Sequence, residues 1–337
     1  MTDDKFVKTA LAAVFLFTVG VILKLARPVL IPFILAVFVS YIIDPALTFL
    51  TRCRCPKPWA VAIVLVGAFV ALYLSGVLVY TTGKSFVAEL PKYQERLADI
   101  NRMLGESAGR LKIDLTSVMS QMDLAGAGRL IVKAIGPFFG VLGKLLLLFV
   151  FLVVIVAGRG RLEAKLAKAA GGASAGRIRG ILVRINSQVQ RYLVIKTAVG
   201  IGNGLMVWVV LEIFGVDFAF LFGLIAFLLN YIPNIGSVIA TVLRVGFAFF
   251  QFGTLWTPFW ILVITTGLDN ILGNIIEPRL MGRGLGLSPL LVFFSLLFWG
   301  WLWGVPGMIL SVPLTAVIRI VCQNVSALKP IAVLMGP

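Results

Sequence analysis

Four side chains that could bind a polar solute or a hard cation lie close together in an apolar part of the sequence. Asn270, Asn274 and Glu277 are spaced four and three residues apart, which puts them on one face of a helix, and Asp269 lies on an adjacent face. Amides and carboxylates on one stripe offer donors and acceptors to a solute, or oxygen ligands to a cation. We therefore predict a binding site here. The alternatives are hydrogen bonding to a neighbouring helix and solvation of Glu277 near the inner surface.

The apolar stretch Phe218–Phe250 is interrupted by a run that carries four further candidates, Asn230, Pro233, Asn234 and Gly236. Proline removes a backbone donor and leaves carbonyls of the preceding turn free. Those carbonyls and the two amides could converge on one point of a solute site. The alternative is an ordinary tight turn, in which asparagine and glycine are common.

A second apolar stretch, Ser288–Val321, is interrupted by a glycine-rich run that includes Gly304 and Gly307. These glycines give the break its backbone freedom, and we include both among the solute-binding candidates. Three carboxylates are candidates to carry a coupling proton or sodium ion: Asp44, Asp269 and Glu277. Asp44 precedes a proline near the end of its apolar stretch, so an interfacial position is the alternative for it.

The elements that must position these residues are membrane helices. A helix needs about 20 apolar residues to cross a bilayer, and each interrupted stretch is too long for one crossing and too short for two. We predict that each forms two half-membrane helices, a re-entrant hairpin, because broken helices mark transporter sites. The fold class is then an all-α integral membrane protein with these two broken segments and six spanning helices. The predicted spans are Phe6–Ala26, Val29–Thr51, Trp59–Gly83, Pro137–Ala157, Leu193–Phe214 and Leu255–Glu277. Pro278 is expected to end the last of them.

The rest of the chain connects these elements. Residues 84–136 read as an extracytoplasmic insertion of amphipathic helices, one through Leu90–Leu104 and a second around Leu115–Met122. We divide the chain into an N-terminal three-span unit (1–83), this insertion (84–136), the fourth span with a basic cytoplasmic linker (137–191) and a transport core (192–337).

Composition narrows the class of protein. Of the 337 residues, 60% are hydrophobic and 13% charged, against about 25% charged in soluble domains. The net charge of +16 indicates loops that face anionic lipid headgroups, with no nucleic acid as partner. The chain has no histidine, three cysteines and no nucleotide-binding glycine motif. We therefore expect no enzyme activity, no cofactor and no metal site.

Charge also predicts the orientation. The segment Gly158–Arg191 holds eight basic residues and one acid, which favours the cytoplasm. Counting the predicted membrane crossings in both directions from this segment places both termini in the cytoplasm and residues 84–136 outside. Arg244 follows the first break by about 15 Å of helix, which would place it at the outer interface.

Four motifs occur together in the C-terminal half, followed by Pro313. They are Asn230-Tyr231-Ile232-Pro233-Asn234-Ile235-Gly236, Ile276-Glu277-Pro278-Arg279-Leu280-Met281-Gly282, Leu285-Gly286-Leu287-Ser288-Pro289-Leu290 and Trp303-Gly304-Val305-Pro306-Gly307-Met308. As a set they resemble the autoinducer-2 exporter family of permeases. The resemblance implies a bacterial inner-membrane secondary transporter or exporter that forms homo-oligomers, pentamers by expectation, with elevator-like motion. The family usually has proline where Arg244 stands.

The leading hypothesis is a secondary transporter of a small hydrophilic solute, such as an autoinducer-2-like signalling molecule or a related metabolite. The nearest alternative is a sodium (or other cation)/proton antiporter, in which Asp269 and Glu277 carry the proton. A membrane scaffold that transports nothing is the alternative from another class. Gly200, Gly202 and Gly204 also predict close helix contact, which we connect with homo-oligomer formation.

Overall fold

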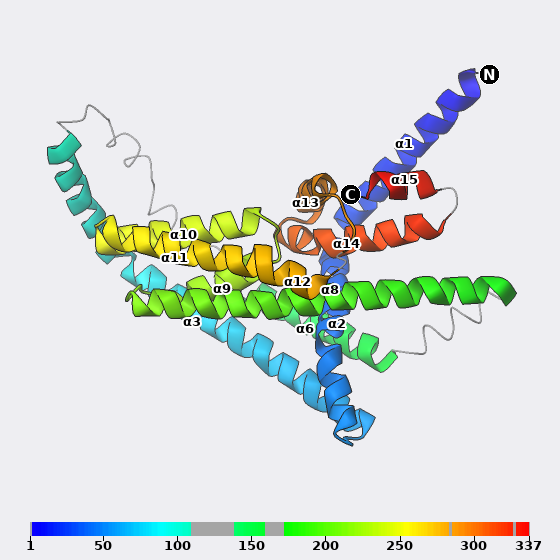
Figure 1. The fold of residues 1–337 in the computed structure, drawn as a ribbon, viewed down its shortest axis with the longest axis horizontal. Coiled ribbons are helices and arrows are strands. Elements are labelled where there is room, and N and C mark those ends of the chain that lie inside the picture. Colours follow the sequence, from blue (N-terminus) through cyan, green and yellow to red (C-terminus); the bar gives the residue numbers. More distant parts are fainter. Residues whose placement is uncertain (1, 109–137, 159–171, 283–284, 326–327, 337) are drawn as a thin grey trace. The chain divides into compact units, whose positions relative to one another are not determined.

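The computed structural model describes residues 2–108, 138–158, 172–282, 285–325 and 328–336 (Figure 1). These residues contain helices and no strand, as the sequence predicts. The helices are α1 (Thr2–Leu25), α2 (Arg27–Arg52), α3 (Lys57–Ala108), α6 (Phe138–Gly158), α8 (Gly172–Ile213), α9 (Ala219–Leu229), α10 (Ile235–Phe252), α11 (Trp256–Asn270), the π-helix η1 (Ile271–Ile276), α12 (Glu277–Met281), α13 (Pro289–Trp303), α14 (Val305–Asn324) and α15 (Lys329–Leu334).

The chain divides into two compact units. Unit 1 takes Met1–Leu65, Lys144–Ile195 and Met281–Pro337, and unit 2 takes Val66–Gly143 and Lys196–Leu280. The core of unit 1 includes Trp299, Leu302 and Leu310, from both arms of the second broken segment. The core of unit 2 is built around Val207, Leu211 and Ile261. Each broken segment therefore contributes to the core of one unit.

Six helical segments among the described residues are long and apolar enough to cross a bilayer. They are Arg27–Arg52, Lys57–Ser85, Gly180–Ile213, Ile235–Phe252, Trp256–Met281 and Val305–Asn324. Four of them overlap the second, third, fifth and sixth predicted spans. The other two are the second arms of the broken segments, which the sequence assigned to half-membrane helices.

Both predicted breaks interrupt a helix. The first falls between α9 and α10, and the second is the one residue Gly304 between α13 and α14, and in each case the two helices pack against one another. Their arms are unequal. The 11-residue α9 and the 15-residue α13 extend about 16 and 22 Å, while the 18-residue α10 and the 20-residue α14 extend about 27 and 30 Å. Helices α10 and α14 are therefore longer than half a bilayer, and the re-entrant hairpins stay a prediction.

The first two predicted spans do not form a reversing pair. Only Ala26 separates α1 from α2, and it has right-handed helical backbone angles. The Ala26 amide bonds to the Ile22 carbonyl, and the Leu30 amide bonds to the Ala26 carbonyl, so helical hydrogen bonding continues across the junction (Figure 1). Pro28 lies in the first turn of α2, a position where proline is well tolerated.

Two helices extend beyond their apolar spans. The third span continues without a break at residue 84 into the predicted insertion, where α3 covers Leu90–Leu104. The predicted second amphipathic helix, around Leu115–Met122, lies outside the described residues. Helix α8 begins within the basic linker and contains its last 20 residues as well as the fifth span. At the ends of the two apolar spans the hydropathy of the sequence falls, while the helical backbone hydrogen bonding continues.

Pro278 does not end its helix. Helix α11 continues through η1 into α12, and Pro278 lies inside this continuous run. In a regular α-helix the proline ring clashes with the carbonyl four residues earlier. The π-helical turn directly before Pro278 changes this register: the Glu277 amide bonds to the Leu272 carbonyl, five residues back. Such turns are rare and are frequent at functional sites.

Candidate functional site

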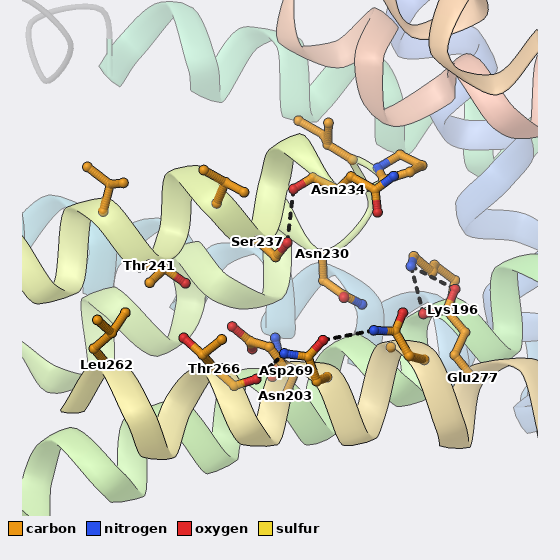
Figure 2. A pocket seen from close by; sticks show the side chains of 17 residues that line it. Lys196, Asn203, Asn230, Asn234, Ser237, Thr241, Leu262, Thr266, Asp269 and Glu277 are labelled. Atoms are coloured by element: carbon orange, nitrogen blue, oxygen red, sulfur yellow. Dashed lines mark hydrogen bonds and ion pairs between the residues drawn. The ribbon is translucent and has the colours of Figure 1, made fainter. Parts of the chain in front are cut away.

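The polar candidates of unit 2 surround one cavity of about 550 Å³, which we call the unit 2 cavity (Figure 2). Pockets for small molecules span about 300 to 1,000 Å³, so this volume suits a small solute. The side chains that line it come from α8, the break between α9 and α10, α10 itself and the α11–η1–α12 helix. They are Lys196, Asn203, Asn230, Ile232, Pro233, Asn234, Ser237, Val238, Thr241, Val242, Leu262, Thr266, Asp269, Asn270, Gly273, Asn274 and Glu277.

One wall is the stripe predicted from the sequence. Asp269, Asn270, Asn274 and Glu277 all line the cavity, together with Thr266 one turn earlier. The Asn274 amide nitrogen donates to the Asn270 side-chain oxygen at 2.8 Å. The Asn270 side-chain nitrogen donates to the Thr266 backbone carbonyl at 2.9 Å. This chain of bonds follows the helix axis and fixes the direction in which the two amides point.

The opposite wall comes from the break and from α10. Asn230, Pro233 and Asn234 line the cavity, and Ser237 and Thr241 follow at helical spacing (Figure 2). Asn234 has a positive φ of 58°, a backbone conformation that asparagine tolerates better than most residues. It lies directly before the first residue of α10, so the turn chemistry and the cavity wall depend on the same residue.

Helix α8 closes the site with a lysine. The Lys196 ammonium donates to both carboxylate oxygens of Glu277 at 2.8 Å, and the two side chains are only 7% and 14% exposed. Glu277 is therefore paired with a cation of the protein, while the part of its side chain that remains exposed borders the cavity. A second bond from α8, between the Thr197 and Tyr231 hydroxyls at 2.7 Å, holds the break in place.

The second carboxylate is paired as well. Arg244 of α10 donates through Nη2 to Asp269 Oδ2 at 2.6 Å and to the Thr241 hydroxyl at 2.7 Å. The Arg244 side chain is 1% exposed, so it contacts neither water nor lipid headgroups, and its predicted depth at the outer interface stays a prediction. With Lys196 facing Glu277 and Arg244 facing Asp269, the formal charges of this group sum to zero.

Polar atoms without a protein partner gather in the cavity wall. Four lining side chains each have one such buried atom within the described residues: Asn203 Oδ1, Asn230 Nδ2, Thr266 Oγ1 and Asp269 Oδ1. Each buried group left without a hydrogen bond costs about 1 to 3 kcal/mol. Two of these atoms are acceptors only, one is a donor and one is a hydroxyl oxygen that can do either. All four atoms are buried within the wall, so they mark where its hydrogen bonding is incomplete, while the accessible amides and hydroxyls of the lining are the groups that a solute would meet.

The remaining candidates do not line the unit 2 cavity. A Cβ on Gly236 would overlap the Leu229 carbonyl, and a Cβ on Gly307 would overlap the Trp299 carbonyl. The two glycines therefore allow the start of α10 to lie close to the end of α9, and the start of α14 to lie close to the end of α13. Gly304 supplies a positive φ of 69° at the second break. Asp44 belongs to unit 1, where its carboxylate accepts from the Gln190 side-chain amide at 2.7 Å.

Several residues of the cavity were not predicted from the sequence. Lys196, Asn203, Ser237, Thr241 and Thr266 line it, and Arg244 lies behind Thr241 and Asp269. A signal for two of them exists: Lys196 and Asn203 are polar residues within an apolar span and lie seven residues apart, on one helix face. The three hydroxyl residues carry no such signal, because serine and threonine are common in membrane helices.

Comparison with known proteins agrees with this architecture. Residues 11–327 match the model of the AI-2E family transporter. The chain is 34% identical to the AI-2 transport protein TqsA of Escherichia coli over 320 residues, which cover 93% of this chain and 91% of that protein. It is 32% identical over 315 residues to a protein of Borreliella burgdorferi (93% and 86% covered). It is 30% identical over 332 residues to one of Haemophilus influenzae (97% and 94% covered). The names of both mark transport as their expected role.

The family and the six apolar helices support a multi-pass protein of the bacterial inner membrane. The family is one of transporters and permeases, which is not an enzyme class. The resemblance drawn from the C-terminal motifs is confirmed over nearly the whole sequence, and the chain belongs to the AI-2E transporter family.

Proposed function

We propose that this protein is a secondary transporter that carries a small, uncharged hydrophilic solute through the unit 2 cavity. An autoinducer-2-like signalling molecule or a related metabolite is the candidate solute, because one relative is named for AI-2 transport. The observation that carries the proposal is the cavity itself. Five asparagines line it, and both of its carboxylates already have a cation of the protein as partner.

The charge balance supports an uncharged solute. An anionic solute would approach Asp269 and Glu277, and a cationic one would approach Lys196 and compete with it for Glu277. A solute rich in hydroxyl groups meets neither repulsion, and the amides and hydroxyls of the wall supply both donors and acceptors. A hydrophobic pocket would discriminate weakly between such solutes, whereas buried polar groups reject analogues that leave them unpaired.

The ion pairs weigh against a sodium/proton antiporter. In that reading Asp269 and Glu277 carry the exchanged proton, yet each carboxylate is within 2.8 Å of a lysine or arginine nitrogen. Releasing either carboxylate would require breaking a buried pair, which typically costs about 3 to 5 kcal/mol. A scaffold without transport would leave the polar cavity without a role.

The finer features of the mechanism are part of the same proposal. The two helix pairs α9–α10 and α13–α14 would enter the membrane and return on the same side, and unit 2 would move in an elevator-like way against a homo-oligomeric frame. Gly204 does not support that frame directly, because a Cβ on it would lie 2.7 Å from the Gly223 carbonyl of the same chain. Its close contact joins α8 to α9 instead. The C-terminus and the basic linker would face the cytoplasm, whereas the continuity of α1 and α2 removes the basis for placing the N-terminus there.

Transport into sealed proteoliposomes tests the proposed function. Autoinducer-2 uptake is measured for the unaltered chain and for Asn234→Ala and Asn274→Ala, each of which removes an amide from one wall of the cavity. Asn324→Ala is the matched control, because Asn324 belongs to unit 1 and does not line the unit 2 cavity. We expect at least a tenfold loss for the two cavity variants, equivalent to about 1.4 kcal/mol. Uptake equal to that of the control in both would refute the site.

A further inference from the structure

Arg244 is the largest side chain that is fully buried in the described part of the protein. It projects from α10 in unit 2, and its Nη2 donates hydrogen bonds to Asp269 and to Thr241. The other two nitrogens, Nε and Nη1, are buried and have no hydrogen-bond partner among the described residues. Arg244 is therefore a fully desolvated cation that uses only part of its hydrogen-bonding capacity.

Stability does not explain this arrangement. Replacing a buried ion pair by apolar side chains of similar volume is often neutral or stabilising. Each buried donor that remains unpaired adds a penalty of about 1 to 3 kcal/mol. The surrounding core of unit 2 is apolar, with Ala240, Ala248 and Val245 on the same helix, and would accept a leucine or methionine. The charge of Arg244 therefore has a role that packing alone would not require.

That role follows from the oxygen atoms around Asp269. Its Oδ1 has no hydrogen-bond partner among the described residues, and the same holds for Thr266 Oγ1 and Asn203 Oδ1. All three atoms are buried, in side chains that belong to the lining of the unit 2 cavity. Carboxylate, hydroxyl and amide oxygens are the ligands that hard cations take. Without Arg244 this wall would present an ionised carboxylate and neutral oxygens to the cavity, which is a site suited to a small monovalent cation.

We propose that Arg244 is a tethered counter-ion: its guanidinium takes the place that a coupling cation would occupy beside Asp269. The carboxylate then remains neutralised whether or not a solute is bound, and the solute moves without a co-transported sodium ion. This inference rests on the proposed function, since it specifies the ion requirement of the same cavity. It assigns to Arg244 a positioning and charge-balancing role, with no direct contact to the solute.

Chemical rescue tests the proposal without any solute. In Arg244→Ala the side chain is removed and its place is open to a free guanidinium ion. Thermal unfolding of the purified protein is followed by tryptophan fluorescence in choline chloride, sodium chloride or guanidinium chloride, at equal and non-denaturing concentrations. We expect the unaltered protein to unfold at one temperature in all three salts. Arg244→Ala should unfold several degrees lower in choline and recover in guanidinium.

The double variant Arg244→Ala/Asp269→Asn provides the control, because it lacks the carboxylate that would hold the added cation. We expect its unfolding temperature to be the same in the three salts. Arg244→Lys, which keeps a tethered charge, should also show no response. If Arg244→Ala does not fold, Arg244→Ser is measured in its place, since its short side chain also leaves room for a guanidinium ion and keeps a hydroxyl group near Thr241.

Two results would overturn the proposal. One is an equal response of the single and double variants to guanidinium, whether both respond or neither does. The other is a sodium-dependent stabilisation of the unaltered protein that Asp269→Asn abolishes, because Asp269 would then bind sodium in the presence of Arg244. If the unaltered protein takes up no autoinducer-2, the proposed function is contradicted. The role of Arg244 is still tested in that case, because the unfolding temperatures in the three salts do not depend on the solute.

Discussion

Separating Lys196 from Glu277 tests whether the lysine holds the cavity together as an ion pair. Lys196→Met keeps most of the length of the side chain and removes the charge, and Glu277→Gln removes the charge of its partner with almost no change in shape. The two residues lie 81 positions apart, so their bond links α8 to α12 directly. Each single variant leaves one buried charge without its partner, while the double variant leaves none.

The expected loss follows from the geometry. Lys196 forms two charged hydrogen bonds of 2.8 Å, and such bonds contribute about 1.5 to 3 kcal/mol each. Because both side chains are at least 86% buried, solvent screening is small and the loss on removing one partner should be about 3 to 5 kcal/mol. The double variant should lose less than the sum of the two singles, by at least about 2 kcal/mol of coupling.

The free energy of unfolding is measured by denaturant titration in detergent micelles, with circular dichroism as the signal. Lys329→Met is the control, because Lys329 is an exposed lysine in α15 of unit 1 and its replacement should change the free energy by less than about 0.5 kcal/mol. If the losses of the two single variants add up to that of the double variant, Lys196 and Glu277 do not act as a pair and the reasoning fails.

Three further predictions follow from the packing and the charge pattern. Gly200→Ala should lower the transport rate, because its Cβ would lie 3.2 Å from the Asn230 side-chain nitrogen. Gly202→Ala, whose Cβ would have nothing within 4 Å, should leave the rate unchanged. Equal transport rates of the two variants would contradict the role of this contact in placing Asn230. Gly307→Ala should reduce the yield of folded protein through overlap with the Trp299 carbonyl, whereas Gly246→Ala, which has open space, should not, as size-exclusion profiles would reveal. Cysteines introduced at Ser174 and Ser107 should react with an impermeant reagent from opposite sides of the membrane, and reaction from the same side would refute the orientation.

The sequence predicts local features of this protein well. The spacing of Asn270, Asn274 and Glu277 places them on one wall because helical periodicity depends only on neighbouring residues. The breaks near Pro233 and Gly304 are likewise predictable, because several helix-disfavouring residues cluster there, whereas the single residues Pro32, Pro45 and Pro313 lie inside helices. The role of these residues in binding remains a prediction.

Two kinds of feature were beyond the sequence. The partners of Glu277 and Asp269 lie 81 and 25 residues away. Only the packing of α8 against α12 and of α10 against α11 brings them together. The lengths of α3 and α8 were missed for a different reason: hydropathy indicates where a segment could meet lipid, while backbone hydrogen bonding decides where a helix ends. Pro278 shows the same limit, since the π-turn that accommodates it has no local sequence signature.

Solute protection of a cysteine in the cavity wall tests the central claim most directly. Ser237→Cys places a thiol on α10 within the unit 2 cavity, in a protein whose Cys53, Cys55 and Cys322 are replaced by serine. Ser187→Cys is the control, since Ser187 is exposed on α8 in unit 1. We predict that a polar thiol reagent inactivates transport through Cys at 237 and that autoinducer-2 slows this reaction, with no effect of the solute at 187. Modification at 237 at the same rate with and without saturating autoinducer-2 would contradict the claim that the solute binds in this cavity.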